Sequence, residues 1–212
     1  MKLLADCRLY TFIDTAYLAG RDPAELARQL CDGGSDLIQV RAKGATVDEA
    51  RRLAAAVLPV TRAAGVRLVI NDHPGLAVEI GAEVCHLGQE DFFDAGFTRI
   101  GQLWADGDRP EIGLSTHAPG QAARAMAADA DYIAIGPVFA TGTKPTAAPV
   151  TPGYVRWAAA NVTVPWFAIG GIHLRNLDEV LAAGATRICV VSAILDAPDV
   201  AAACRGFRRR LG

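Results

Sequence analysis

Two basic side chains follow one short apolar run of this sequence. Arg41 and Lys43 come after the run LIQV, and another lysine, Lys144, lies in a stretch rich in threonine, glycine and proline. The chain has 21 basic residues but only three lysines, so these two lysines are candidates for a task that needs a compact, mobile ammonium group. On an extended strand, residues two apart point the same way. Arg41 and Lys43 therefore predict a bound anion, with a salt bridge to a buried carboxylate as the alternative.

Two aspartates end the next two apolar runs. Asp72 follows LVIN, and Asp91 follows VCHLGQE. Two carboxylates would repel a phosphate unless a hard cation lay between them, and Mg2+ is commonly held by one or two carboxylates plus substrate phosphates. The pair predicts a magnesium site. The alternatives are a helix N-cap at Asp72 and simple ion pairing to Arg41, and Glu90 is disfavoured because alternation along an extended segment would turn it away from Asp91.

The last two apolar runs end differently, in small residues. Gly170 and Gly171 follow WFAI, and Val191 and Ser192 end the final run. Backbone N–H groups in these positions, at strand ends that face helix starts, often bind a single phosphate in α/β barrels. A tight turn is the alternative explanation of the glycine pair. Together these residues predict a second, neutral anion site.

Two anion sites in one cavity are typical of a transferase that displaces a phosphate group. Thr141 and Thr143 would line the gap between the sites, and Mg2+ and lysine would stabilise the departing charge. His86, flanked by apolar neighbours, is predicted to be a hydrogen-bonded core histidine. His117 is a candidate acid or base, although STHAP also fits a helix start.

These residues need elements that bring them to one place. Eight apolar runs recur along the chain, and their continuous character indicates strands buried on both faces, as parallel sheets require. The runs begin near residues 8, 37, 68, 84, 112, 132, 166 and 188. Alternating strands and helices favour a single (β/α)8 barrel domain over residues 1–212, with an open doubly wound sheet as the alternative.

Helix boundaries are readable in several of the intervening segments. Asp22 with Glu25, and Thr46 with Glu49, predict capping boxes at two helix starts. Glycines predict four helix ends, at positions 33, 65, 81 and 184. Residues 92–110 predict a short helix plus a loop, and residues 140–153 predict a long loop without helix. A loop of that length is usually functional.

Composition excludes several classes of protein. A net charge of −2 gives no reason to expect nucleic acid or an anionic membrane as a partner. No apolar run approaches the roughly 18 residues of a membrane span. The five cysteines are scattered without a C-x-x-C pair, which argues against disulfides and a zinc site. These features predict a cytoplasmic protein with small-molecule partners, and they leave its oligomeric state open, a homodimer included.

Seven motifs, in this order, resemble those of the thiamine phosphate synthase family. They are QVRAK, IND, HLGQED, GLSTHA, DYIAIGPVFATGTKP, FAIGGI and VVSAI, and the similarity runs from about residue 9 to the carboxyl end. The resemblance implies a (β/α)8 barrel that joins 4-amino-5-hydroxymethyl-2-methylpyrimidine diphosphate to a thiazole phosphate. Pyrophosphate would leave first, and the thiazole nitrogen would capture the resulting pyrimidine cation without a protein nucleophile.

The resemblance also implies a role for each matching residue. The predicted contacts of the pyrimidine diphosphate are Gln39, Arg41, Lys43, Asn71, Ser115 and Lys144. Among these, Arg41, Lys43, Ser115 and Lys144 would assist the reaction itself. Asp72 and Asp91 would hold Mg2+. The predicted contacts of the thiazole phosphate are Thr141, Thr143, Gly171, Val191 and Ser192.

Two departures and two rivals accompany this resemblance. His73 stands where family members often have arginine, and residues 92–110 lack the usual Ala/Leu/Arg-rich helix pattern. One rival is a thiazole tautomerase of similar fold, which would use a histidine near His117 and need no magnesium pair. The other is a noncatalytic barrel that binds a phosphate ligand. The full set of Asp72, Asp91, Lys43 and Lys144 favours the synthase.

Overall fold

Eight parallel strands close into a barrel in which each strand lies beside its neighbours in the sequence. The computed structural model describes residues 1–104, 109–142 and 148–212. The strands are β1 (Leu9–Asp14), β2 (Leu37–Arg41), β3 (Arg67–Asn71), β4 (Val84–Leu87), β5 (Glu111–Thr116), β6 (Tyr132–Ile135), β7 (Trp166–Ile169) and β8 (Ile188–Cys189). Pairing of β8 with β1 completes the circle. The predicted (β/α)8 barrel is confirmed, and the open doubly wound sheet is wrong.

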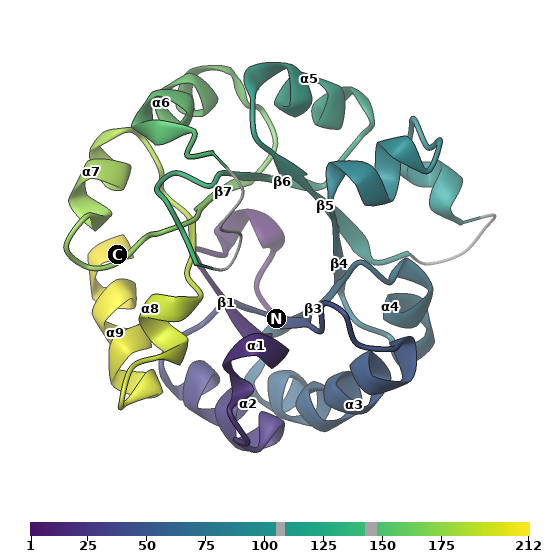
Figure 1. Ribbon diagram of the computed structural model, residues 1–212, viewed down its shortest axis with the longest axis vertical. Helices are drawn as coiled ribbons and strands as arrows, with labels where there is room; N and C mark the ends of the chain where they lie inside the picture. Colours follow the sequence, from purple (N-terminus) through teal and green to yellow (C-terminus); the bar gives the residue numbers. More distant parts are fainter. Residues whose placement is uncertain (105–108, 143–147) are drawn as a thin grey trace.

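Helices form the outer layer of the barrel (Figure 1). They are α1 (Thr15–Leu18), α2 (Pro23–Asp32), α3 (Val47–Ala64), α4 (Pro74–Ile80), α5 (Pro119–Ala127), α6 (Thr151–Asn161), α7 (Leu177–Ala182), α8 (Ser192–Leu195) and α9 (Val200–Leu211). A 3-10 helix, η1 (Leu4–Asp6), precedes β1. A π-helical turn, η2 (Glu90–Asp94), and a 3-10 helix, η3 (Ile100–Leu103), lie between β4 and β5.

The strands are buried on both faces, as their continuous apolar character predicts. All six residues of β1 are buried, and so are all four residues of β4 and of β6. Inside the barrel, the rings of Tyr10, Tyr132 and Phe167 meet edge to face, with centroids 5.5 to 6.2 Å apart. Such pairs add stabilisation beyond the burial of their area. The interior is therefore a packed core.

The helix boundaries largely follow the sequence signals. Thr46 caps α3 in a complete capping box with Glu49, whereas Asp22 caps α2 without the reciprocal bond, because Glu25 binds Arg28 and Gln29 instead. Gly65 and Gly81 are left-handed C-caps. The predicted loop 140–153 was too long, since α6 already begins at Thr151. Residues 92–110 contain short helical turns, as predicted, apart from 105–108, which lie outside the described residues.

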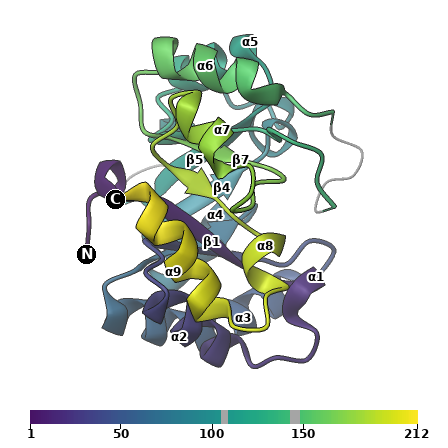
Figure 2. The ribbon, with the colours of Figure 1, turned by 90° about the vertical axis from the view of Figure 1, so that its left-hand side faces the viewer.

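The two ends of the barrel differ. In Figure 2 both chain termini lie at one side of the molecule, and α1 lies at the opposite side, where the strands end. At the amino end, Asp36 lies just before β2 and is 6% exposed. It accepts hydrogen bonds from Lys2 Nζ (2.5 Å), Arg8 N (2.7 Å), Leu9 N (3.1 Å) and Arg208 Nη1 (3.1 Å). This aspartate ties the amino-terminal segment and α9 to the barrel.

Candidate active site

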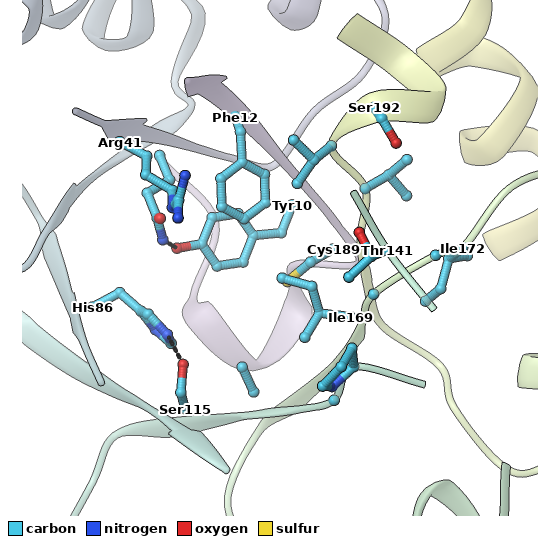
Figure 3. A pocket seen from close by; sticks show the side chains of 18 of the residues that line it. Tyr10, Phe12, Arg41, His86, Ser115, Thr141, Ile169, Ile172, Cys189 and Ser192 are labelled. Atoms are coloured by element: carbon cyan, nitrogen blue, oxygen red, sulfur yellow. Dashed lines mark hydrogen bonds between the residues drawn. The ribbon is translucent and has the colours of Figure 1, made fainter. Parts of the chain in front are cut away.

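A pocket opens at the carboxyl ends of the strands (Figure 3). Much of its lining comes from alternate positions of the strands, because alternate side chains of a barrel strand point inward. Lining residues that fit this alternation are Tyr10, Phe12, Gln39, Arg41, Asn71, His86, Ser115, Ala134, Gly136, Ile169, Cys189 and Val191. Thr141, Gly171 and Ser192 also line the pocket. Eight of the residues predicted to bind substrates therefore surround one cavity: Gln39, Arg41, Asn71, Ser115, Thr141, Gly171, Val191 and Ser192.

Arg41 is fixed at the rim by a buried carboxylate. Its Nη1 lies 2.6 Å from Oδ2 of Asp14, whose side chain is 1% exposed, while the Arg41 side chain is 13% exposed. The other oxygen of Asp14 accepts a hydrogen bond from Ala16 N at 3.0 Å and caps α1. The salt bridge considered as an alternative for Arg41 thus exists, and Arg41 still lines the pocket.

Lys43 does not point the same way as Arg41. The extended conformation ends at Arg41, and Lys43 lies in the turn that follows, so alternation no longer applies. Arg41 pairs with β1, whereas Lys43 Nζ lies 2.5 Å from Oδ2 of Asp72, just after β3. Lys43 lines a second, open hollow together with Gly44 and Arg52. The two cations therefore diverge toward the strands on either side of β2.

Asp72 and Asp91 lie at the same end of neighbouring strands. Asp72 N donates to the carbonyl of His86 in β4 at 2.9 Å, and the Asp91 carboxylate accepts from Gly88 N at 3.1 Å. Burial raises the pKa of the Cys85 thiol in β4, and the negative charges of Asp72 and Asp91 add to that increase. Both carboxylates are therefore near the end of β4.

The alternatives proposed for Asp72 do not describe it. His73 is the N-cap residue of α4, and Asp72 pairs with Lys43 instead of Arg41. The reason given against Glu90 was wrong, because Glu90 and Asp91 belong to a π-helical turn in which strand alternation does not hold. Within the described ranges, no group of three or more His, Cys, Asp or Glu side chains could hold a metal ion. Two carboxylates do fit Mg2+ that is also held by substrate phosphates.

The wall formed by β4 and β5 carries several neutral polar groups. His86 is 8% exposed, with Nδ1 2.9 Å from Tyr132 Oη and Nε2 2.9 Å from Ser115 Oγ. The hydrogen-bonded core histidine is confirmed, and the same ring lines the pocket. Gln89 Nε2 donates to the Ser115 carbonyl at 2.6 Å. His117 Nδ1 lies 2.5 Å from the Gly136 carbonyl, two residues before α5 begins.

The glycine pair after β7 is required by close packing. Gly170 and Gly171 have φ angles of 102° and 63°. A Cβ atom at Gly170 would lie 2.4 Å from Pro137, and one at Gly171 would lie 2.6 Å from the Ala140 carbonyl. These glycines let residues 137–140 pack over the strand end and so place Thr141 at the pocket. The expected helix start is absent here, because α7 begins only at Leu177, whereas α8 does begin at Ser192.

Two predicted site residues, Thr143 and Lys144, lie outside the described part of the chain. The pocket also contains residues that the sequence motifs did not indicate. Tyr10 and Phe12 form a stacked pair on the pocket side of β1, with ring centroids 5.1 Å apart and planes 4° apart. Tyr10, Phe12 and Asp14 alternate along β1, so the period of two in a barrel strand was the signal that could have identified all three.

Comparisons with known proteins agree with this geometry. A family model described as thiamine monophosphate synthase matches residues 9–194. The thiamine-phosphate synthase of Thermus thermophilus is 46% identical over 180 residues, which cover 84% of each chain. That of Acidothermus cellulolyticus is 43% identical over 210 residues, covering 98% of this chain and 96% of the relative. The solved thiamine phosphate pyrophosphorylase of Pyrococcus furiosus superposes with a TM-score of 0.86 at 27% identity, covering 99% of this chain and 98% of that one.

Proposed function

Because this chain belongs to the thiamine monophosphate synthase family, we propose that it transfers the hydroxymethylpyrimidine group from its diphosphate to thiazole phosphate. The reaction releases pyrophosphate and forms thiamine phosphate. One observation carries the proposal for this site: residues predicted for the two substrates come from β2, β3 and β5 and from the segments after β6, β7 and β8, and they line a single pocket. A transferase needs both substrates in contact, and one shared cavity provides that proximity.

The pyrimidine diphosphate would occupy the side of the pocket near β2, β3 and β5. Gln39, Arg41, Asn71 and Ser115 line that side and would contact the ring and its diphosphate. Arg41 suits the diphosphate because a guanidinium offers several fixed donors to anionic oxygens. Asp14 holds that guanidinium at the rim, so it is oriented before the substrate arrives. Lys43 and Lys144 would place positive charge beside the diphosphate as it leaves.

Mg2+ is the proposed metal, held by Asp72 and Asp91 together with diphosphate oxygens. It would supply positive charge that stabilises the leaving pyrophosphate. Lys43 pairs with Asp72, so its ammonium group is a second positive charge beside the proposed metal site. Asp72 and Asp91 would hold the diphosphate only through Mg2+, and the ammonium group of Lys43 would contact the diphosphate oxygens directly.

The thiazole phosphate would occupy the opposite side of the pocket. Thr141, Gly171, Val191 and Ser192 lie there, and Thr143 is the further predicted contact outside the described residues. Hydroxyl and backbone N–H groups can bind a phosphate without adding charge. The stacked rings of Tyr10 and Phe12 lie between the two sides and would shield the pyrimidine cation from water.

The partners and location proposed from the sequence are small molecules and the cytoplasm. All five cysteines are free thiols, which suits a reducing compartment. In the described ranges, no helix is both long enough and apolar enough to cross a membrane.

The decisive experiment mixes the purified chain with both substrates and Mg2+ and measures thiamine phosphate and pyrophosphate. We expect both products in equal amounts and no turnover when the metal is chelated. Conversion of the thiazole substrate alone, without pyrophosphate release, would identify a tautomerase. Binding without any product would identify a noncatalytic barrel.

A further inference from the structure

A chain of hydrogen bonds crosses the floor of the pocket and links two residues expected to contact the pyrimidine substrate. It starts at Gln39 in β2, whose Nε2 donates to Tyr10 Oη in β1. Tyr10 Oη lies 3.1 Å from Tyr132 Oη in β6, and Tyr132 Oη lies 2.9 Å from His86 Nδ1 in β4. His86 Nε2 lies 2.9 Å from Ser115 Oγ in β5, and Figure 3 shows this last bond at the pocket wall.

The rings in this chain are held in place by their surroundings. Tyr10 and Tyr132 are 1% and 0% exposed, and both contact Phe167 edge to face. Gly113, in the middle of β5, makes room for Tyr132, because a Cβ atom there would lie 2.0 Å from its Cζ atom. A glycine inside a strand often marks such a close approach. The phenol of Tyr132 therefore has little freedom to move from its position between Tyr10 and His86.

The direction of the hydrogen bonds follows from the first donor. An amide nitrogen can only donate, so Tyr10 Oη accepts from Gln39, and its single hydrogen is left for Tyr132. Tyr132 in turn donates its single hydrogen to His86 Nδ1. Burial raises the pKa of Tyr10 and of Tyr132 well above the usual value of a phenol, so each side chain keeps its hydroxyl hydrogen. Nδ1 therefore carries no hydrogen, and the ring hydrogen of His86 is on Nε2.

We infer that Tyr10, Tyr132 and His86 form a directional relay that fixes the Ser115 hydroxyl as a hydrogen-bond donor toward the substrate. Ser115 Oγ accepts from His86 Nε2, which leaves its own hydrogen for the pocket that it lines. The Gln89 side chain donates to the backbone carbonyl of Ser115 and so holds the backbone of that residue. The recognised group must then be an acceptor, such as a diphosphate oxygen or a ring nitrogen. Tyr132 and His86 are positioning residues in this scheme.

The inference rests on the proposed function only for the identity of the substrate, because the relay itself belongs to the free protein. Its first test is nitrogen NMR of the wild-type protein labelled at the imidazole nitrogens. The His86 signals are assigned from their loss in His86→Gln, since the chain has only four histidines. We expect the Nε2–H tautomer. The Nδ1–H tautomer would reverse the direction of the chain and overturn the inference, whether or not the protein makes thiamine phosphate.

The second test removes one hydroxyl from the relay. Tyr132 does not line the pocket, and Tyr132→Phe keeps the ring while it removes both the donor to His86 and the acceptor for Tyr10. We expect a mixture of His86 tautomers and a kcat lowered roughly ten- to a hundredfold, as when groups that orient a functional residue are removed. KM for the pyrimidine diphosphate should change little. A wild-type tautomer with a wild-type rate would overturn the relay; if the variant does not fold, the wild-type tautomer still decides.

Tyr154→Phe is the matched control. Tyr154 is also a buried phenol, 6% exposed, and its hydroxyl binds Thr116 Oγ1 and the Ala118 carbonyl, each at 2.9 Å. Its loss should lower stability about as much as the loss of the Tyr132 hydroxyl and leave the His86 tautomer unchanged. A change of tautomer in both variants would indicate a general loosening of the barrel and would count against the relay.

Discussion

The two ends of this barrel use aspartate for different purposes. At the amino end, Asp36 is surrounded by four donors from the chain itself: Lys2, Arg208 and the backbone of Arg8 and Leu9. At the carboxyl end, in the part of the chain that the structure describes, the Asp91 carboxylate accepts one hydrogen bond, from Gly88. A carboxylate has about four acceptor positions. Asp36 therefore has none to offer a ligand, whereas Asp91 does.

This difference teaches that charge alone does not identify a site. Both ends contain cations next to carboxylates, and at the carboxyl end the paired cation Arg41 lines the pocket. In such barrels, binding groups usually lie at the carboxyl ends of the strands, and groups that stabilise the fold lie at the amino ends. Substitutions at the two ends of the barrel test that division.

Asp91→Asn should cause the largest loss. Removing one proposed metal-binding charge should lower kcat/KM about a thousandfold, because metal stabilisation of a leaving group is worth several kcal/mol. Steady-state kinetics over a range of Mg2+ concentrations measures the effect, and the concentration for half-maximal rate should rise. Circular dichroism should show an unchanged fold.

Glu90→Gln is the matched control for that variant, because Glu90 is the neighbouring exposed acid in the same π-helical turn. Its rate and its Mg2+ dependence should stay close to the wild type. Equal losses in both variants would mean that general negative charge matters, and Asp91 would no longer be assigned as a ligand.

Asp36→Ala should affect stability and leave the activity of the folded enzyme intact. Its side chain is 3% exposed, and its removal leaves two backbone N–H groups without their acceptor. We expect a loss of about 2 to 4 kcal/mol, below the usual maximum for a broken buried pair because the Lys2 and Arg208 side chains can reach water. Urea denaturation measures the loss. A large loss of kcat in the folded variant would contradict the division between the two ends.

The contribution of Asp36 should also depend on pH. Burial alone would raise the pKa of this carboxyl, but the bonds from Lys2, Arg8, Leu9 and Arg208 outweigh it and leave the pKa below the usual 3.8. A lowered pKa in the folded state gives stability that is complete above the unfolded pKa and is lost as the pH falls through the folded one. The stability difference between wild type and Asp36→Ala should therefore shrink below about pH 4. A constant difference down to pH 2 would refute this.

Thr46→Ala should have the smallest effect. Thr46 lies at the carboxyl end of the barrel, and among the described residues its side chain bonds to Glu49, in the capping box that begins α3. Loss of such a cap costs about 1 kcal/mol, or roughly 2–4 °C in Tm for a chain of this size. Calorimetry measures the shift, and the rate should stay at the wild-type level. A matching fall in rate would extend the functional region to the start of α3.

Much of the fold could be predicted because it depends on local patterns. Each strand appears as an apolar run that ends in polar or small residues, and Thr46 with Glu49 marks the start of α3. Where the local conformation changed, the prediction failed. Lys43 lies in a turn and Glu90 in a π-helical turn, so strand alternation gave the wrong orientation for Lys43 and a wrong argument for Glu90.

The sequence by itself therefore determined eight strands and the polar groups at their carboxyl ends, because burial patterns and turn preferences depend on residues that are close together in the sequence. Only the tertiary structure decided which of those groups meet. Tyr10 and Tyr132 are 122 residues apart and share a hydrogen bond because the barrel closes, and Arg41 binds Asp14 because β1 lies beside β2. Contacts across a closed sheet depend on the register of every strand between them, which no single segment encodes.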